Sequence, residues 1–254
     1  MFIFSFIIFL ISCVPEKISI LPNGAERIEV SLVYDGDTFK DTSGIVYRVI
    51  GIDTPEVHTN TKPKGEFAQE AKEFLQDYVS KNDIYVLKMG EDVYGRALAY
   101  VFGVDESGSV TFYEEEVTKE GLARPLIYEE NAIDEYIERI VDAYRYAYEE
   151  RKGIFSKWET APVIDDPSEV DTHVGSIVWL EFHVNDVHEN SYLYILDGEW
   201  AEVIIRKDGF EYTFDDFNPY SFKGKRIRVY GELWKYGKKA EILLRAVFEI
   251  LPSE

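Results

Sequence analysis

The sequence predicts an α+β protein, mainly β with some helix, built from two successive barrels of five strands each. Three observations lead to this prediction. Short β patterns in residues 27–103 are interrupted once by an amphipathic helical pattern, further helical patterns follow up to residue 151, and residues 172–254 contain β patterns alone. Five strands with a helix between the third and the fourth fit a small Greek-key barrel of the OB type.

The first barrel is predicted from alternating polar and apolar residues and from the turns between them. Asp35-Gly36 turns the first strand, and the turn "DTSG" separates the second strand from the third. In the helical segment, Phe67, Ala71 and Leu75 share one face. Strands are expected at 27–33, 37–40, 45–50, 84–89 and 97–103, and helices at 66–79, 114–123 and 131–151.

The second half follows a linker that is rich in Pro and acidic residues. We expect residues 27–156 to form the first domain, 157–171 the linker and 172–254 the second domain. A five-stranded barrel is the simplest closure of the second domain, and a sandwich is also compatible with its pattern. Its strands are expected at 175–184, 191–196, 201–206, 225–233 and 240–250.

Strand alternation also predicts a surface of the second domain. If Phe182 points inward, Trp179, which lies three residues before it on the same strand, points outward. Leu193 and Ile195 pointing inward would likewise leave Tyr192 and Tyr194 outside, and the strand "KRIRVYG" would present Arg226, Arg228 and Tyr230. Aromatic residues beside arginines would form a platform for single-stranded nucleic acid. The alternative is that these residues dock the two domains together.

Charge and cysteine content limit the possible functions. The 254 residues include 48 acidic and 27 basic side chains, and the net charge is −21. Such a charge favours solubility and opposes purely electrostatic adhesion to nucleic acid, so a polyanionic ligand would need local arginines or a metal ion. Cys13 is the only cysteine, which excludes an intrachain disulfide and a cysteine-based zinc site.

An apolar run, "FIFSFIIFLIS", occupies residues 2–12. It is shorter than the roughly 20 residues of a membrane-spanning helix and suits the core of a signal peptide. The run leads into "LISC", which resembles the bacterial lipobox. On this interpretation residues 1–12 are a signal peptide, Cys13 is lipidated, and residues 13–26 tether an extracytoplasmic lipoprotein to the membrane. An ordinary cleaved signal, giving a secreted protein, and a buried strand are the alternatives.

The segment "DGDTFKDTSGIVYRVIGIDTPE", residues 35–56, gathers acidic side chains around one arginine. Asp37 and Asp53 are expected to meet at one end of the meander. Carboxylates that lie close together repel each other unless a cation neutralises them, and a hard, oxygen-ligated ion such as Ca²⁺ suits this pair. An EF-hand is excluded, because with Asp35 as first ligand the final Glu would fall at Val46.

A metal ion beside Arg48 matches phosphodiester hydrolysis, because the negative charge of the transition state lies on oxygens that both can neutralise. Glu56 is placed to orient or deprotonate the attacking water. The segment "DVYGR" adds Tyr94 and Arg96, and a second arginine can bind phosphate through two hydrogen bonds.

Four motifs, "DGDT", "YRVIGIDTPE", "DVYGRALAYVFG" and "EGLARPLIY", occur in this order with a helix between the second and the third. Together they resemble the staphylococcal nuclease (thermonuclease) family over about residues 27–156. The resemblance implies a Ca²⁺-dependent endonuclease that hydrolyses DNA and RNA on an OB barrel. Some relatives with this barrel are protein or RNA scaffolds without catalysis, which is the competing functional class.

The resemblance also implies roles for individual residues. Asp37 and Asp53 would be calcium carboxylates, and Thr54 would add its backbone carbonyl. Glu56 would be the catalytic carboxylate. The remaining implied roles are phosphate binding by Arg48 and Arg96, and a hydrogen bond from Tyr94 to the nucleotide phosphate.

The sequence departs from the family in the region that would contact the substrate. The family has a tyrosine that stacks on the base after "GLA"; here Ile127 takes the aligned position and Tyr128 follows it. Tyr128 is the substitute that we expect. Lys62 and Lys64, in the loop before the first helix, are the other basic candidates for substrate binding.

Overall fold

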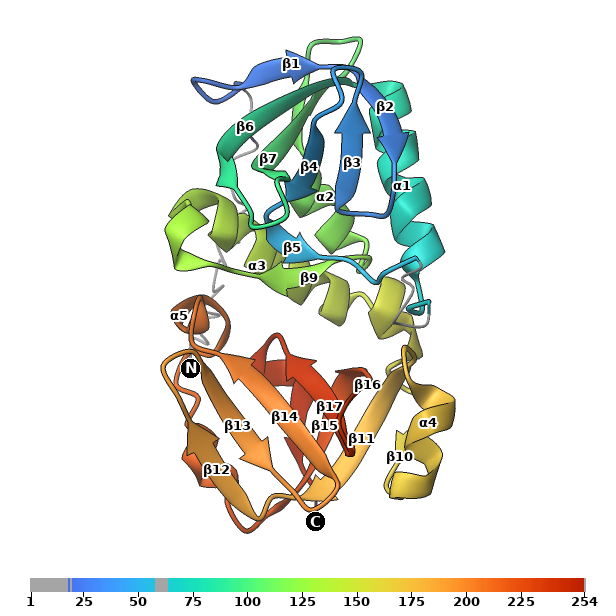
Figure 1. The fold of residues 1–254 in the computed structure, drawn as a ribbon, viewed down its shortest axis with the longest axis vertical. Helices are drawn as coiled ribbons and strands as arrows, with labels where there is room; N and C mark the ends of the chain where they lie inside the picture. The colour runs from blue at the N-terminus through green and yellow to red at the C-terminus, as the bar shows by residue number, and fades with distance from the viewer. Residues whose placement is uncertain (1–17, 19, 58–63, 254) are drawn as a thin grey trace, which may run out of the picture.

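The computed structural model describes residues 18, 20–57 and 64–253. Cys13, the predicted signal peptide and Lys62 lie outside the described residues. In the described part of the chain, no helix has the length and apolar composition needed to cross a bilayer. Figure 1 shows two units stacked along the long axis, with the described residues up to about 157 in the upper one and the described residues after them in the lower one.

The N-terminal unit is a curled sheet with the order β1-β6-β7-β4-β3-β2. Its five expected strands are present, the first of them interrupted at Glu29. All neighbours are antiparallel except β4 and β7, which pair in parallel, and β8 extends the sheet beyond β7. The strands are β1 (Glu26–Ile28), β2 (Val30–Val33), β3 (Thr38–Asp41), β4 (Val46–Val49), β6 (Asp83–Glu91), β7 (Ala97–Val104) and β8 (Val110–Phe112).

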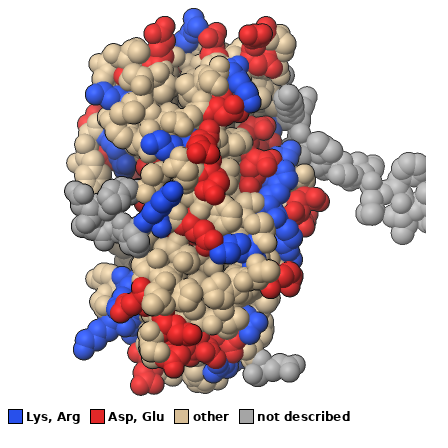
Figure 2. Space-filling view, turned by 90° about the vertical axis from the view of Figure 1, so that its right-hand side faces the viewer, with Lys and Arg blue, Asp and Glu red and all other residues tan. Residues whose placement is uncertain are grey.

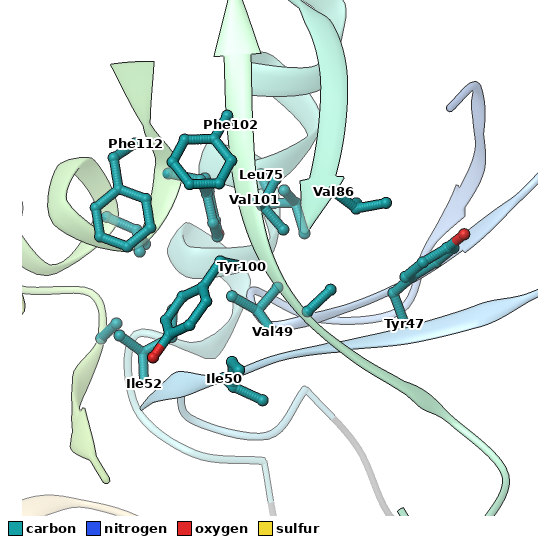
Figure 3. Close-up of a cluster of buried hydrophobic side chains, with 14 of the residues drawn as sticks. Tyr47, Val49, Ile50, Ile52, Leu75, Val86, Tyr100, Val101, Phe102 and Phe112 are labelled. Carbon is teal, nitrogen blue, oxygen red and sulfur yellow. The ribbon is translucent and has the colours of Figure 1, made fainter. Parts of the chain in front are cut away.

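The barrel closes on a core of large side chains from strands and helices (Figure 3). Tyr100 and Phe102 on β7 pack beside Phe112, whose ring is stacked on that of Phe102 at 5.3 Å between centroids. Leu75 contributes from α1 (Ala68–Lys81), and it is fully buried. The apolar face predicted for this helix therefore packs against the barrel.

A second, small sheet lies between the barrel and the C-terminal unit (Figure 1). It consists of β5 (Gly51–Asp53) and β9 (Arg124–Leu126), and it pairs Asp53 with Arg124. Gly51 has a φ of +78°, and a Cβ there would lie 2.8 Å from Ile140, so only glycine allows this turn away from β4. The helices α2 (Tyr113–Lys119) and α3 (Asp134–Glu149) pack around this sheet.

The C-terminal unit contains two sheets, β10-β11-β15-β18 and β12-β13-β14-β17-β16. Short helices accompany them: α4 (Val170–His173) and α5 (Phe210–Thr213). The short strands β10, β12, β16 and β18 were not expected as separate elements. The strands are β10 (Val163–Ile164), β11 (Ile177–His183), β12 (Asp186–Glu189), β13 (Leu193–Asp197), β14 (Ala201–Arg206), β15 (Arg226–Glu232), β16 (Trp234–Tyr236), β17 (Lys239–Leu244) and β18 (Ile250–Pro252).

The two units share one strand topology. In the N-terminal unit β4, which is followed by the short strand β5 and then by α1, pairs in parallel with the last long strand, β7. In the C-terminal unit β14 precedes the helical segment and pairs in parallel with β17 in the same way. Both patterns are those of an OB-type barrel, and the predicted fold class is confirmed.

The predicted platform on the second unit is wrong. Trp179 is 6% exposed and Tyr230 is fully buried, and both pack against Trp158 of the connecting segment at centroid distances of 4.5 and 4.7 Å. Arg226 and Arg228 remain at the surface, where both bind Glu181. Both faces of β11 are buried, so the aromatic residues dock the two units together, which was the alternative.

Candidate active site

Asp35 and Asp37 lie in the tight turn between β2 and β3. The backbone N–H of Asp37 donates to the Asp35 carboxylate at 3.2 Å, which stabilises the turn. Gly36 between them has no room for a side chain, because a Cβ there would lie 2.8 Å from both Ala71 and the Thr54 methyl group. Glycine thus lets the acidic turn approach the residue that follows β5.

Arg48 on β4 joins the two aspartates that the sequence selected. Its guanidinium lies 3.0 Å from Asp37 and 3.2 Å from Asp53. The same group donates to the backbone carbonyls of Val49 and Ile52 at 2.6 and 3.2 Å. Arg48 is therefore held by both strands at the junction of β4 and β5, and its side chain is only 14% exposed.

Asp37 accepts hydrogen bonds on both carboxylate oxygens. Oδ2 accepts from the backbone N–H and the hydroxyl of Thr54, at 2.7 and 3.0 Å, and Oδ1 accepts from Thr38. Burial nevertheless raises the pKa of Asp37 to about 7, against the attraction of Arg48 and with added repulsion from Asp35 and Asp53. In the metal-free protein Asp37 therefore keeps a proton to a higher pH than an ordinary aspartate does.

Glu56 belongs to the same group of charges. Burial and then the charge of Glu56 raise the pKa of Asp35, and Glu56 also contributes to the raised pKa of Arg48. The carbonyl of Glu56 accepts from Gly65 at 2.9 Å, so the chain returns to this residue at the end of the loop. The neighbouring Lys64 is exposed at the edge of the site.

Asp53 is contacted from the C-terminal unit by an arginine that the sequence did not select. Arg245 donates to Asp53 Oδ2 at 2.6 Å and to the carbonyl of Pro125 at 2.9 Å. Burial opposes ionisation of Asp53, but Arg245, Arg48 and Arg124 outweigh it and lower the pKa. The sequence contained one indication that Arg245 has a buried partner, because Arg245 is a charged residue within the apolar segment "ILLRAVFEIL".

Arg124 forms a second link between the units. Its guanidinium is 4.0 Å from Asp53 and pairs directly with Glu232 on β15. Both partners are almost fully buried, and the positive charge is retained because Glu232 and Asp53 raise the pKa of Arg124 against the effect of burial. Three arginines, 48, 124 and 245, thus surround Asp53.

Arg96 and Tyr94 lie on the hairpin between β6 and β7. Arg96 binds Asp92 at 2.8 Å, and its guanidinium lies 5.6 Å from the centre of the Tyr94 ring. Arg96 directly precedes Ala97 on β7. Ala97 pairs with Tyr47, which directly precedes Arg48 on β4. Arg96 thus lies two residues before Leu98, the partner of Arg48, and its side chain pairs with Asp92 instead of with the central carboxylates.

Tyr128 also contacts the C-terminal unit. The guanidinium of Arg206 stacks over its ring at 4.3 Å, and the ring remains 41% exposed. Ile127 is buried against Gly209, where a Cβ would lie 2.5 Å from the isoleucine. The departure at Ile127 therefore has a structural reason, since this position docks the second unit.

The donor chemistry of the site fits a hard cation. Asp37, Asp53 and the Thr54 carbonyl are oxygen donors, and Asp35 and Glu56 add nearby charge. Among the described residues, however, no three His, Cys, Asp or Glu side chains converge as a ready metal site. Arg48 and Arg245 occupy the two oxygens of Asp53, so a cation would share this carboxylate with guanidinium groups.

A family model described as "Staphylococcal nuclease homologue" matches residues 46–157. This range contains Arg48, Asp53, Glu56, Arg96 and Tyr128, and it ends where the C-terminal unit begins. The acidic turn with Asp35 and Asp37 precedes it.

Curated relatives match about half of the chain. The thermonuclease of Staphylococcus hyicus is 35% identical over 148 residues, which are 56% of this chain and 83% of the relative. The thermonuclease of Staphylococcus intermedius is 32% identical, with 56% of this chain and 84% of the relative covered. A probable endonuclease of Saccharomyces cerevisiae is 32% identical over 127 residues, which are 48% of this chain and 45% of the relative.

Proposed function

The chain belongs to the staphylococcal nuclease family, and from this membership we propose that it is a Ca²⁺-dependent nuclease that hydrolyses phosphodiester bonds in DNA and RNA. The position of Arg48 supports the proposal most strongly. Its guanidinium lies within 3.2 Å of both Asp37 and Asp53, so a cation site and a phosphate-binding group would occupy one end of the barrel.

Oxygen donors and cationic side chains would have different roles in the reaction. Asp37, Asp53 and the Thr54 carbonyl would hold Ca²⁺, which when bound supplies Lewis-acid charge to a phosphate oxygen. Arg48 and Arg96 would neutralise the charge that develops on the phosphate. Glu56 would orient or deprotonate the attacking water, a contribution typically worth 10²- to 10⁴-fold in rate.

The substrate contacts would come from residues around this end of the barrel. Tyr94 would donate a hydrogen bond to a phosphate, and the open part of the Tyr128 ring would contact a base. Lys62 and Lys64 would bind the strand through its phosphates.

A cleavage assay on the full chain tests the proposal. Plasmid DNA, single-stranded DNA and RNA are incubated with Ca²⁺ or with chelator, and cleavage is expected only with Ca²⁺. Arg48→Ala and Arg96→Ala should each lower the rate by roughly 10²- to 10⁵-fold. Arg228→Ala is the matched control, because Arg228 lies on the C-terminal unit and binds Glu181 there. Near-normal cleavage by a folded Arg48→Ala variant would overturn the assignment.

A non-catalytic binding scaffold is the second candidate. It is favoured by one observation, that Arg48 and Arg245 engage both carboxylate oxygens of Asp53. A wild-type chain that binds nucleic acid but cleaves none of the three substrates at any Ca²⁺ concentration would support the scaffold instead.

For the N-terminus we propose an extracytoplasmic lipoprotein anchored to the membrane through Cys13. The support is the sequence "LISC" after an apolar run. Replacing Cys13 by Ser should move the protein out of the detergent-soluble membrane fraction. Unchanged fractionation, together with an N-terminal mass that lacks lipid, would reject the anchor.

A further inference from the structure

A cleft of about 640 Å³ opens between the two units, directly beside Asp53. Arg124 and Arg245 line its inner part, and the strand β16 with Trp234, Lys235 and Tyr236 lines its other side. Its lining contains three basic and three acidic residues, whereas the whole chain has a net charge of −21. The acidic chain as a whole repels a polyanion, but in the cleft basic residues equal the acidic ones in number.

The strand β16 continues into a hairpin with an unusual composition. The sequence "WKYGKK" (234–239) combines two aromatic residues and three lysines in a strongly acidic chain. Tyr236 pairs with Lys239 across the turn, and Gly237 has a φ of +60°, as tight hairpin turns require. The hairpin therefore presents its residues on a short, paired strand.

The exposed residues of this hairpin are available to a ligand. Tyr236 is 75% exposed although it is a large aromatic side chain. Lys235 pairs with Asp171, and Lys239 pairs with Asp197, but Lys238 at the tip makes no ion pair within residues 20–57 and 64–253. An exposed ring beside an unpaired lysine is the combination that stacks a base and binds the adjacent phosphate.

The face drawn in Figure 2 has no broad basic surface that could bind nucleic acid by charge alone. There acidic and basic side chains are interspersed and form no continuous basic surface. Affinity would then have to come from local stacking, which needs unpaired bases. In a duplex the base faces are stacked on one another and are not accessible to Tyr236.

From these observations we propose that the cleft and the 234–239 hairpin bind single-stranded nucleic acid on its way to Asp53, with Tyr236 stacking on a base and Lys238 on a phosphate. This inference rests on the proposed nuclease function and assigns the C-terminal unit a role in it. Strand binding then extends from the N-terminal unit across the interface to the second barrel.

Binding of a fluorescein-labelled thymidine oligonucleotide of about 12 nucleotides to the full chain tests the inference. The measurement is fluorescence anisotropy in the presence of chelator, so that cleavage does not contribute. Tyr236→Ala should weaken binding roughly 5- to 100-fold, the range for the loss of one stacked base. Lys238→Ala should lower the slope of log Kd against log salt by about 0.7, the value for one phosphate contact on a single strand. A merely structural role would not change this slope.

Two matched variants serve as controls. Tyr192 is 71% exposed but does not line the cleft, and Lys225 is exposed at the opposite end of β15. Tyr192→Ala and Lys225→Ala should bind as the wild type does. Equal affinity of the wild type and Tyr236→Ala, or an equal loss in Tyr192→Ala, would overturn the inference. If Tyr236→Ala binds more weakly but the wild type cleaves nothing with Ca²⁺, the proposed function fails and the binding site stands.

Discussion

Asp53 is paired with arginines from both units of the molecule. Arg48 holds Oδ1 at 3.2 Å from within the barrel, and Arg245 holds Oδ2 at 2.6 Å from the C-terminal unit. A cation bound to Asp53 would therefore lie close to two guanidinium groups that repel it. The cation affinity of the proposed site would therefore depend on a residue that the second unit supplies.

Arg245→Met removes this positive charge and keeps most of the side-chain length. We expect Ca²⁺ affinity, measured by isothermal titration calorimetry, to rise roughly tenfold, because a repulsive charge a few ångströms away is lost. The metal-free variant should also lose about 1–3 kcal/mol in its free energy of unfolding, since Asp53 and the carbonyl of Pro125 lose a donor. The control for the metal measurement is Arg228→Met, which should leave the Ca²⁺ affinity unchanged because Arg228 binds Glu181. Unchanged or weaker Ca²⁺ binding by Arg245→Met would contradict the expectation.

At the scale of single elements, α2 carries a buried acid that contacts no cation in the described chain. Glu114 is fully buried, and its carboxylate accepts the backbone N–H of Val101 on β7. Burial raises the pKa of Glu114 well above its ordinary value of 4.5. The folded protein therefore holds a proton on this residue under conditions in which the unfolded chain has released it.

Because the folded and unfolded states bind different numbers of protons, the free energy of unfolding should fall as the pH rises between the two pKa values of Glu114. Because the folded state binds more protons, the contribution of Glu114 is fully present below about pH 4.5 and is lost as the pH rises toward its folded pKa. Glu114→Gln stays neutral at every pH, so its free energy of unfolding relative to the wild type should increase by about 1.4 kcal/mol per pH unit within that window. Urea unfolding at several pH values measures this difference. A difference that stays flat between pH values for Glu114→Gln would contradict this expectation.

Local patterns in the sequence predicted the long strands and the helices of the N-terminal unit, but not the short strands β5, β8 and β9. They also predicted the acidic group at the end of the unit. Asp37, Arg48 and Asp53 are close in sequence and joined by short strands, so their meeting follows from a β meander. The burial of Trp179 and Tyr230 could not be predicted in this way. Alternation assumes that one face of a strand is exposed to water, whereas the interface between the units covers the second face of β11.

The contact between Arg245 and Asp53 escaped prediction for a related reason. The two residues are separated by 192 positions in the chain, and only the docking of the units brings them together. The periodicity of either segment describes its own element and contains no information about such a partner. A charged residue in an apolar run indicates that a partner exists but does not identify it.

At the scale of the whole molecule, the cores of the two units are joined by a third group of buried residues. Tyr144 and Phe155 come from the N-terminal unit, Trp179 and Tyr230 from the C-terminal unit, and Trp158 packs between them. The hydroxyl of Tyr230 donates to the carbonyl of Ile154 at 2.5 Å. Truncation after the linker would therefore expose aromatic side chains that the N-terminal unit now buries.

This continuity predicts that the two units unfold as one cooperative structure. Tyr230→Ala removes a fully buried ring at the joint and should lower the free energy of unfolding by about 3–5 kcal/mol. Native-state hydrogen exchange at β7 and at β14 measures the two cores separately, and the variant should lower the protection of the slowest amides equally in both. Tyr236→Ala, at a ring that is 75% exposed, should change stability by no more than about 0.5 kcal/mol. A loss confined to β14 would mean that the units fold independently and that the arginine contacts to Asp53 form only after each barrel is complete.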